Sequence, residues 1–285
     1  MYIDTHQHYW CPELGYYDWL KSENAILQRD YLPEHAAEWQ RELGIEASVV
    51  VQAAPTPEET SFLLGLAERN PSISGVVGWL DLESPEFPEE FERMRLNRKL
   101  VGLRPMLHTI SDKNWVLQPQ VVSNLRVMAA EQFPLDIVMQ GEHLDRIVEL
   151  QRQIPDLRLA IDHLGSPDVR GQRMEPWLEA MTQLAANEQT VCKLSGMMTL
   201  TGEGDQMKQL YPYVEQVVRL FGPSRIMFGT DWPVSLYGGA IQEVFELFEG
   251  LLHSLVPAQD HDRVRYHNAF QFYGLDPLNH TAGSN

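Results

Sequence analysis

Residues 47–53, Ala-Ser-Val-Val-Val-Gln-Ala, form a short run of β-branched and apolar residues that is typical of a buried strand. Shortly after it, Pro57 precedes Glu58 and Glu59, a combination that favours the start of a helix. Apolar residues then recur with helical spacing at Phe62, Leu63, Leu66 and Ala67. The stretch therefore predicts one strand followed by one helix.

The same unit recurs along the whole chain. Eight apolar runs are predicted as strands: residues 2–6, 47–53, 74–80, 100–107, 135–140, 158–163, 190–195 and 225–230. Most are continuous rather than alternating runs, as in parallel strands that are covered on both faces. Helices are predicted from Pro33 to Gly44, from Pro57, and at 88–97, 118–132, 142–153, 174–187, 206–221 and 239–255.

Eight strand-helix units in 285 residues predict an α/β fold, a single-domain (β/α)8 TIM-type barrel. An open doubly wound sheet has the same alternation, but no G-x-G-x-x-G motif follows a strand to support it. We expect the barrel domain to span residues 1–278, with a last helix near 262–273 packed on its outside. The tail, residues 279–285, is expected to be disordered.

The charge balance excludes several partners. Lys and Arg number 22 against 40 Asp and Glu, and the net charge of -18 repels nucleic acids and anionic lipids. The two cysteines, Cys11 and Cys192, indicate no structural disulfide and a reducing compartment. No signal peptide or membrane-spanning run is recognised. We expect a cytoplasmic protein with a small-molecule substrate and no nucleic-acid or membrane partner, and a homo-oligomer is left open.

Two histidines lie at the end of the first predicted strand. Side chains two residues apart on a strand share a face, so His6 and His8 can point together into the barrel. That spacing suits a metal ion or an oxyanion held from one side. An H-x-H pair by itself is equally compatible with two ordinary polar residues in a loop.

Other polar residues follow other predicted strands. His163 ends the sixth strand and Asp231 follows the eighth. Because active sites of such barrels lie at the carboxyl ends of the strands, these two residues are expected to meet His6 and His8. The alternatives are a hydrogen-bonded His163 beneath a loop and an Asp231 that only caps a helix. Asp162 is expected to point away from His163 and to have a structural role.

Two cations lie inside apolar strands. Arg104 is interpreted as a residue that faces the substrate or as a member of a buried salt bridge. Lys193 has the same two alternatives, ion pair or substrate electrophile. The predicted substrate-binding residues, all at or near strand ends, are Arg104, Lys193, Gln52, Trp79, His108 and Gln140.

Four motifs in this order resemble one protein family. They are I-D-T-H-Q-H-Y-W at 3–10, D-H-L-G at 162–165, C-K-L-S-G at 192–196 and F-G-T-D-W-P at 228–233. The set resembles the amidohydrolase-related branch of the amidohydrolase superfamily, in particular its sugar-lactone and dicarboxylate-lactone hydrolases. The resemblance runs over nearly the whole chain, including Q-A-A-P at 52–55 and the closing segment 267–275.

The resemblance implies a distorted barrel whose site histidines are His6, His8 and His163 and whose aspartate is Asp231. Members of this branch hydrolyse lactones such as fuconolactone, rhamnonolactone or pyrone dicarboxylate, and related branches decarboxylate aromatic acids. Some use one divalent metal, usually zinc, and others work without one. Arg104 and Gln140 stand where two-metal members need a lysine and a histidine, so a binuclear site is not expected.

The leading hypothesis is a lactonase of carbohydrate catabolism. Asp231 serves as general base and then as general acid, while His6, His8 and His163, with or without one divalent metal, polarise the carbonyl or bind the water. If the metal is present, its ligands are the same four residues. The alternatives are a metal-dependent decarboxylase on the same scaffold and a non-catalytic barrel that binds a small ligand.

Overall fold

The computed structural model describes residues 1–22 and 25–276 and has eight parallel strands in sequential order. They are β1 (Tyr2–Gln7), β2 (Ile45–Val51), β3 (Ile73–Gly78), β4 (Leu100–Leu103), β5 (Leu135–Ile137), β6 (Leu159–Ile161), β7 (Thr190–Leu194) and β8 (Ile226–Phe228). The predicted (β/α)8 barrel is confirmed. The prediction of a disordered tail at 279–285 lies outside the described residues.

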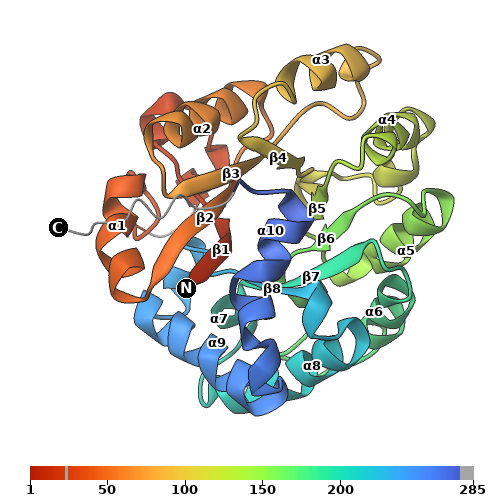
Figure 1. Ribbon diagram of the computed structural model, residues 1–285. Helices are drawn as coiled ribbons and strands as arrows, with labels where there is room; N and C mark the ends of the chain where they lie inside the picture. The colour runs from red at the N-terminus through yellow and green to blue at the C-terminus, as the bar shows by residue number, and fades with distance from the viewer. Residues whose placement is uncertain (23–24, 277–285) are drawn as a thin grey trace.

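Helices surround the strands as an outer ring (Figure 1). They are α1 (Pro33–Glu42), α2 (Pro57–Arg69), α3 (Phe87–Met94), α4 (Pro119–Ala130), α5 (Leu144–Gln153), α6 (Trp177–Ala185), α8 (Gln206–Phe221) and α9 (Ile241–Leu255), with the short α7 (Met197–Leu200) after β7. Proline occupies the first position of α1, α2 and α4, where its fixed φ suits a helix and its missing N–H costs no hydrogen bond. Strand residues that face the helices form the larger core.

Several strands end earlier than predicted. β4 ends at Leu103 instead of residue 107, and β5 ends at Ile137 instead of residue 140. Pro105 has no N–H to donate to a neighbouring strand, which explains the early end of β4. The residues that follow these short strands leave the sheet, so their side chains are no longer bound to the two-residue alternation of a strand.

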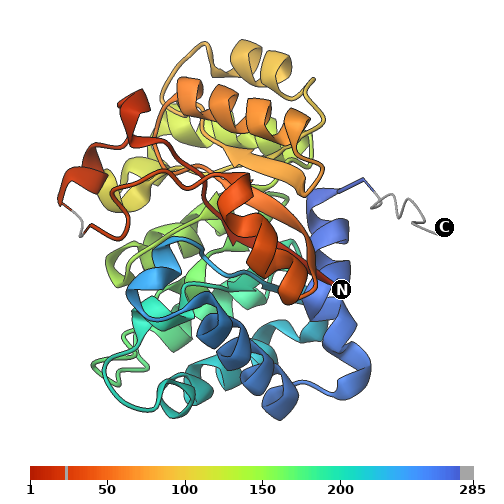
Figure 2. The same cartoon turned by 90° about the vertical axis from the view of Figure 1, so that its left-hand side faces the viewer.

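The last helix lies elsewhere than predicted. A π-helical turn (Arg263–His267) leads into α10 (Asn268–Tyr273), which lies across the amino ends of the strands rather than on the outer wall (Figure 1). Phe272 and Tyr273 pack there with inward-facing residues such as Ile3 and Val49. This end of the barrel would otherwise expose that apolar surface to water, which is the physical reason for the placement. In Figure 2, α10 lies at one end of the barrel and the loop after β1 at the other.

The barrel closes where β8 meets β1. Asp4 is fully buried and accepts hydrogen bonds from Thr230 N at 2.8 Å and Thr230 Oγ1 at 2.5 Å. The same carboxylate accepts from Gln7 Nε2 at 2.7 Å and from the backbone N–H of His6 at 3.1 Å. The two donors of Thr230 thus connect the end of the last strand to the first, while those of Gln7 and His6 fix the carboxylate within β1.

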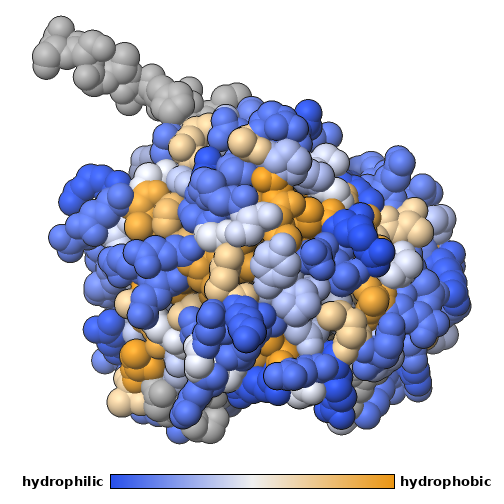
Figure 3. Space-filling view, turned by 90° about the horizontal axis from the view of Figure 1, so that it is seen from below, coloured by the Kyte–Doolittle hydropathy of each residue, from blue (hydrophilic) through white to orange (hydrophobic). Residues whose placement is uncertain are grey.

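The outer surface agrees with the composition. Hydrophilic residues cover most of the face in Figure 3, with hydrophobic atoms showing between them. Among the described residues, helices are all too short or too polar to cross a membrane. Cys11 and Cys192 are both free thiols, so the prediction that they form no disulfide is confirmed.

Candidate active site

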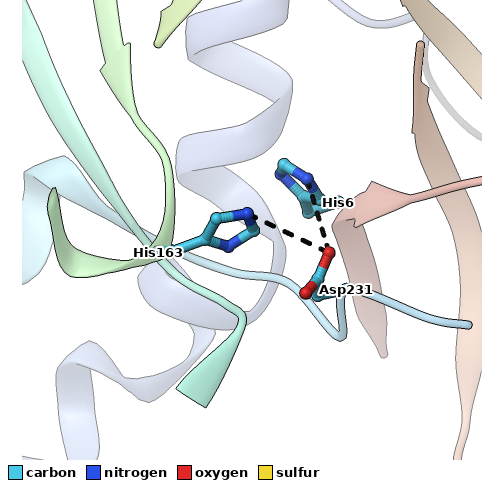
Figure 4. A group of neighbouring side chains, drawn as sticks. All are labelled: His6, His163 and Asp231. Carbon is cyan, nitrogen blue, oxygen red and sulfur yellow. Dashed lines mark ion pairs between the residues drawn. The ribbon is translucent and has the colours of Figure 1, made fainter. Parts of the chain in front are cut away.

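Three histidines and one aspartate meet at the carboxyl ends of β1, β6 and β8. Oδ1 of Asp231 lies 3.3 Å from Nε2 of His8 and 3.7 Å from Nε2 of His6. Nε2 of His163 lies 4.0 Å from the same oxygen. Figure 4 shows His6, His163 and Asp231 pointing toward one another from separate segments. The structure thus brings together the four residues that the sequence singled out.

The backbone turns sharply at two of these residues. His163 has φ 53° and Asp231 has φ 60°, both in the left-handed region that non-glycine residues avoid. Each such conformation costs on the order of 1–3 kcal/mol, and it persists only where the surroundings enforce it. The turn at His163 ends the strand alternation, so that Asp162 and His163 both contribute to the site.

Each site imidazole is held through its Nδ1 atom by a different kind of group. Nδ1 of His8 donates to the carbonyl oxygen of Val51 at 2.8 Å, and Nδ1 of His6 lies 3.2 Å from Oδ1 of Asp162. A carbonyl can only accept, so His8 carries its proton on Nδ1. Nδ1 of His6 has an acceptor, Asp162, and a donor, Lys193, at similar distances. Because the guanidinium of Arg104 can only donate to Nε2 of His6, this ring also carries its proton on Nδ1. Their Nε2 lone pairs therefore face the site.

His163 differs from the other two histidines. Its Nδ1 lies 2.9 Å from Oγ of Ser195, a hydroxyl that can either donate or accept. The backbone N–H of His163 donates to the same Oγ at 3.3 Å. His163 can therefore face the site with either a lone pair or an N–H on Nε2.

Burial and neighbouring charges set the protonation states. Burial lowers the pKa of His6 and of His8, so both imidazoles are neutral at pH 7. Burial alone would raise the pKa of Asp231, but the imidazoles of His163, His8 and His6 outweigh it and lower that pKa to about 2. The site thus combines neutral rings with an ionised carboxylate, the form that a general base needs.

The structure gives Asp162 a position at the site, contrary to the prediction that it points away. Its carboxylate lies 3.2 Å from His6 Nδ1, 3.1 Å from Lys193 Nζ and 3.4 Å from Arg104 Nη1. Ser195, in the C-K-L-S-G motif, was given no role in the sequence analysis. Both residues belong to the motifs quoted above, and that was the one signal available for them.

Arg104 is buried, and both Nη atoms of its guanidinium have partners, whereas its buried Nε has none among the described residues. It pairs with Asp162, lies 3.3 Å from Nε2 of His6 and donates to the carbonyl of Gln52. The side chain of Gln52 is fully buried and donates to the carbonyl of Arg104 at 2.7 Å. The salt-bridge interpretation of Arg104 therefore describes its contacts, and Gln52 holds Arg104 in place.

Lys193 has no exposed side-chain surface. Its ammonium lies 2.5 Å from Asp136 and 3.1 Å from Asp162, so it is a buried ion-pair member beneath His6 and does not reach a substrate. This corrects its prediction as a substrate-binding residue. The pair could have been predicted from the sequence, because Asp136 and Lys193 both lie in apolar runs predicted as strands. A buried acid and a buried base in one barrel are expected to pair with each other.

The other predicted binding residues lie farther out. Trp79 is half-buried, whereas His108 and Gln140 are exposed. Although part of the His108 side chain is exposed, the protein atoms packed around its ring partly desolvate it and, with Arg104, His143 and His163, lower its pKa to about 4. His108 therefore lies near the site and is neutral at pH 7. The structure gives no contact of Gln140 with the four site residues.

His6, His163 and Asp231 can hold a metal ion. Each offers one ligand atom, and these atoms lie within 4.8 Å of one another. Imidazole nitrogens whose other nitrogen is already held, together with a carboxylate, form a donor set that suits zinc. Arg104 lies beside Nε2 of His6 and competes with a cation for that nitrogen. The donor set fits one divalent ion.

Fold and site together define a (β/α)8-barrel hydrolase with a histidine and aspartate centre at the carboxyl ends of its strands. The chain belongs to the amidohydrolase family, since the family model described as "Amidohydrolase" matches residues 3–275. The predicted family is confirmed.

Named relatives lie within this family. The chain is 36% identical over 239 residues to an L-fucono-1,5-lactonase of Burkholderia ambifaria, covering 83% of this chain and 82% of the relative. It is 30% identical to an L-fucono-1,5-lactonase of Burkholderia multivorans, covering 96% of each chain. A crystal structure of an amidohydrolase from Burkholderia multivorans with bound zinc is similar with a TM-score of 0.92 and 30% identity, over 97% of this chain and 100% of that one.

Proposed function

We propose that this protein hydrolyses a sugar lactone, with Asp231 as the general base and then the general acid. The observation that carries the proposal is the position of Oδ1 of Asp231, 3.3 Å to 4.0 Å from three imidazole nitrogens in a buried site. Family membership and the names of the relatives support the same reaction.

The reaction follows from these groups. Asp231 takes a proton from water while the water oxygen bonds to the lactone carbonyl carbon, and the carbonyl electron pair moves to its oxygen. An N–H on Nε2 of His163 donates to that developing oxyanion. As the carbonyl re-forms, the bond to the ring oxygen breaks and Asp231 returns the proton to that oxygen. The product is an open-chain hydroxy acid.

The charges favour an uncharged substrate. Arg104 already pairs with Asp162 and with the carbonyl of Gln52, and Lys193 lies between two carboxylates. Neither cation is free to bind a substrate carboxylate, so a neutral polyhydroxylated lactone fits better than a dicarboxylate lactone. His108 and Trp79 are proposed to line the substrate side, and Gln140 stays a prediction.

We further propose that the metal, when present, is zinc held by His6, His163 and Asp231, with His8 beside them. Zinc would supply Lewis-acid polarisation of the lactone carbonyl. Elemental analysis of the protein as isolated, followed by removal of metal with a chelator, tests this part alone. Absence of zinc together with unchanged turnover would contradict it.

A substrate panel tests the reaction. Acid release from fuconolactone, rhamnonolactone and pyrone dicarboxylate is followed with a pH indicator, and carbon dioxide release from aromatic acids is measured in parallel. We expect turnover of the neutral lactones, with little of the dicarboxylate. Carbon dioxide release without lactone turnover would instead support a decarboxylase. A cytoplasmic location and a role in carbohydrate breakdown stay predictions.

A further inference from the structure

A chain of buried polar groups connects the last helix to the site. The hydroxyl of Tyr273, on α10, donates to the carboxylate of Asp136 and lies 2.9 Å from both of its oxygens. Asp136 pairs with Lys193 at 2.5 Å, and Lys193 pairs with Asp162 at 3.1 Å. Oδ1 of Asp162 then lies 3.2 Å from Nδ1 of His6. The chain runs from the amino end of the barrel to a site imidazole.

Packing alone does not require these groups. Tyr273, Asp136, Lys193 and Asp162 are all buried, and apolar residues surround this layer on the side of α10. Replacing such an ionic cluster with apolar residues of similar size often leaves a protein as stable or more so. A charged layer at this depth therefore needs a reason other than stability.

That reason is the orientation of His6. Lys193 Nζ lies 3.3 Å from Nδ1 of His6, close enough to donate to that nitrogen and so to favour the ring proton on Nε2 instead. The ammonium must therefore stay directed at its carboxylates for Nδ1–H to point at Asp162. Tyr273 fixes Asp136 through both oxygens, and Asp136 in turn holds the ammonium of Lys193 at 2.5 Å.

We propose that Tyr273 is a positioning residue for His6, acting through Asp136, Lys193 and Asp162 to keep the imidazole proton on Nδ1 and to leave the lone pair of Nε2 for the N–H of Arg104. The inference extends the proposed lactonase function. It makes the helix that closes the barrel a part of the active-site scaffold.

The test compares Tyr273→Phe with Tyr266→Phe, which removes the hydroxyl of a neighbouring tyrosine that donates to the exposed Asp262. In protein labelled with nitrogen-15 at histidine, NMR reports which ring nitrogen of His6 carries the proton. His8, held by Val51, is an internal reference in the same spectrum. This readout needs no substrate, so it stands even if the lactonase proposal fails.

We expect Tyr273→Phe to shift the His6 ring resonances and leave those of His8 in place. With an active lactone, kcat should fall about tenfold, with KM within twofold, because groups that orient a site imidazole affect activity by roughly 10–100-fold. Tyr266→Phe should match the wild type in both measurements.

Unchanged His6 resonances in folded Tyr273→Phe, with kcat equal to that of Tyr266→Phe, would overturn the proposal. A thermal melt shows whether each variant is folded. If Tyr273→Phe does not fold, Asp136→Asn is examined by the same NMR measurement, and an undisturbed His6 in that variant would equally overturn it.

Discussion

Two buried clusters, one above the other in the same barrel, use charge in opposite ways. The ionised carboxylate of Asp231 lies among three imidazoles, and burial keeps two of them neutral. Beneath it, Asp136 and Asp162 are matched by Lys193 and Arg104. The lower cluster is charge-balanced and chemically inert, whereas the upper one keeps a carboxylate available for a proton. Both clusters are buried, so the pairing of charges is what distinguishes the structural cluster from the reactive one.

The largest expected effect is at the upper cluster. Asp231→Asn removes the proton acceptor and should lower kcat by roughly 100- to 10,000-fold. Folding should be retained, because asparagine has nearly the same size and shape as aspartate. Initial rates with the best lactone, together with a thermal melt, check both parts. Activity within tenfold of the wild type would remove Asp231 from the mechanism.

The lower cluster should respond in stability instead. Lys193→Met leaves two buried carboxylates without their shared cation and should lower the free energy of unfolding by about 3–5 kcal/mol. Urea denaturation measures the change. The double variant Lys193→Met with Asp136→Leu should recover part of the loss, since it removes one of the unpaired acids. A single variant as stable as the wild type would contradict the role of Lys193 as a required counter-charge.

An intermediate effect is expected at the hydroxyl that holds His163. Ser195→Ala removes the partner of Nδ1 and should lower kcat about tenfold, with about 1 kcal/mol lost in stability. Ser254→Ala, at a serine exposed on α9, is the matched control and should change neither quantity. Equal kinetics for the two variants would show that His163 needs no support from Ser195.

The smallest change is expected with pH. Asp231, with its pKa lowered to about 2, is ionised throughout the neutral range. His6 and His8, with pKa values lowered by burial, remain neutral below the ordinary histidine pKa of 6.5. Titration of these three groups should therefore change kcat/KM by less than about twofold between pH 8 and pH 6. A steep loss centred near pH 6.5 would indicate that a site imidazole titrates normally.

The sequence was sufficient for the fold and for the four central side chains, because both depend on local rules. Strand runs, helix starts and the position of a polar residue just after a strand can each be recognised within a few residues. His6, His8, His163 and Asp231 were found in this way.

The surroundings of those residues depend on contacts between distant segments. Asp162 was assigned to the wrong side because the left-handed turn at His163 interrupts the alternation on which that prediction relied. Lys193 meets Asp136 from two strands farther back, a pairing that depends on barrel geometry. The place of α10 depends on which apolar surface the other elements leave uncovered.

The carboxylate of Asp4 affects when the active site can form during synthesis and folding. It joins residues 226 positions apart, and His6 and Asp231 lie on the two sides of that junction. During most of its synthesis on the ribosome, the chain therefore contains the first two site histidines but not yet Asp231, the carboxylate of the site. Contacts between such distant positions form late, since a long loop must first close. Catalytic activity should thus arise in one step, when the first and last strands of the barrel meet.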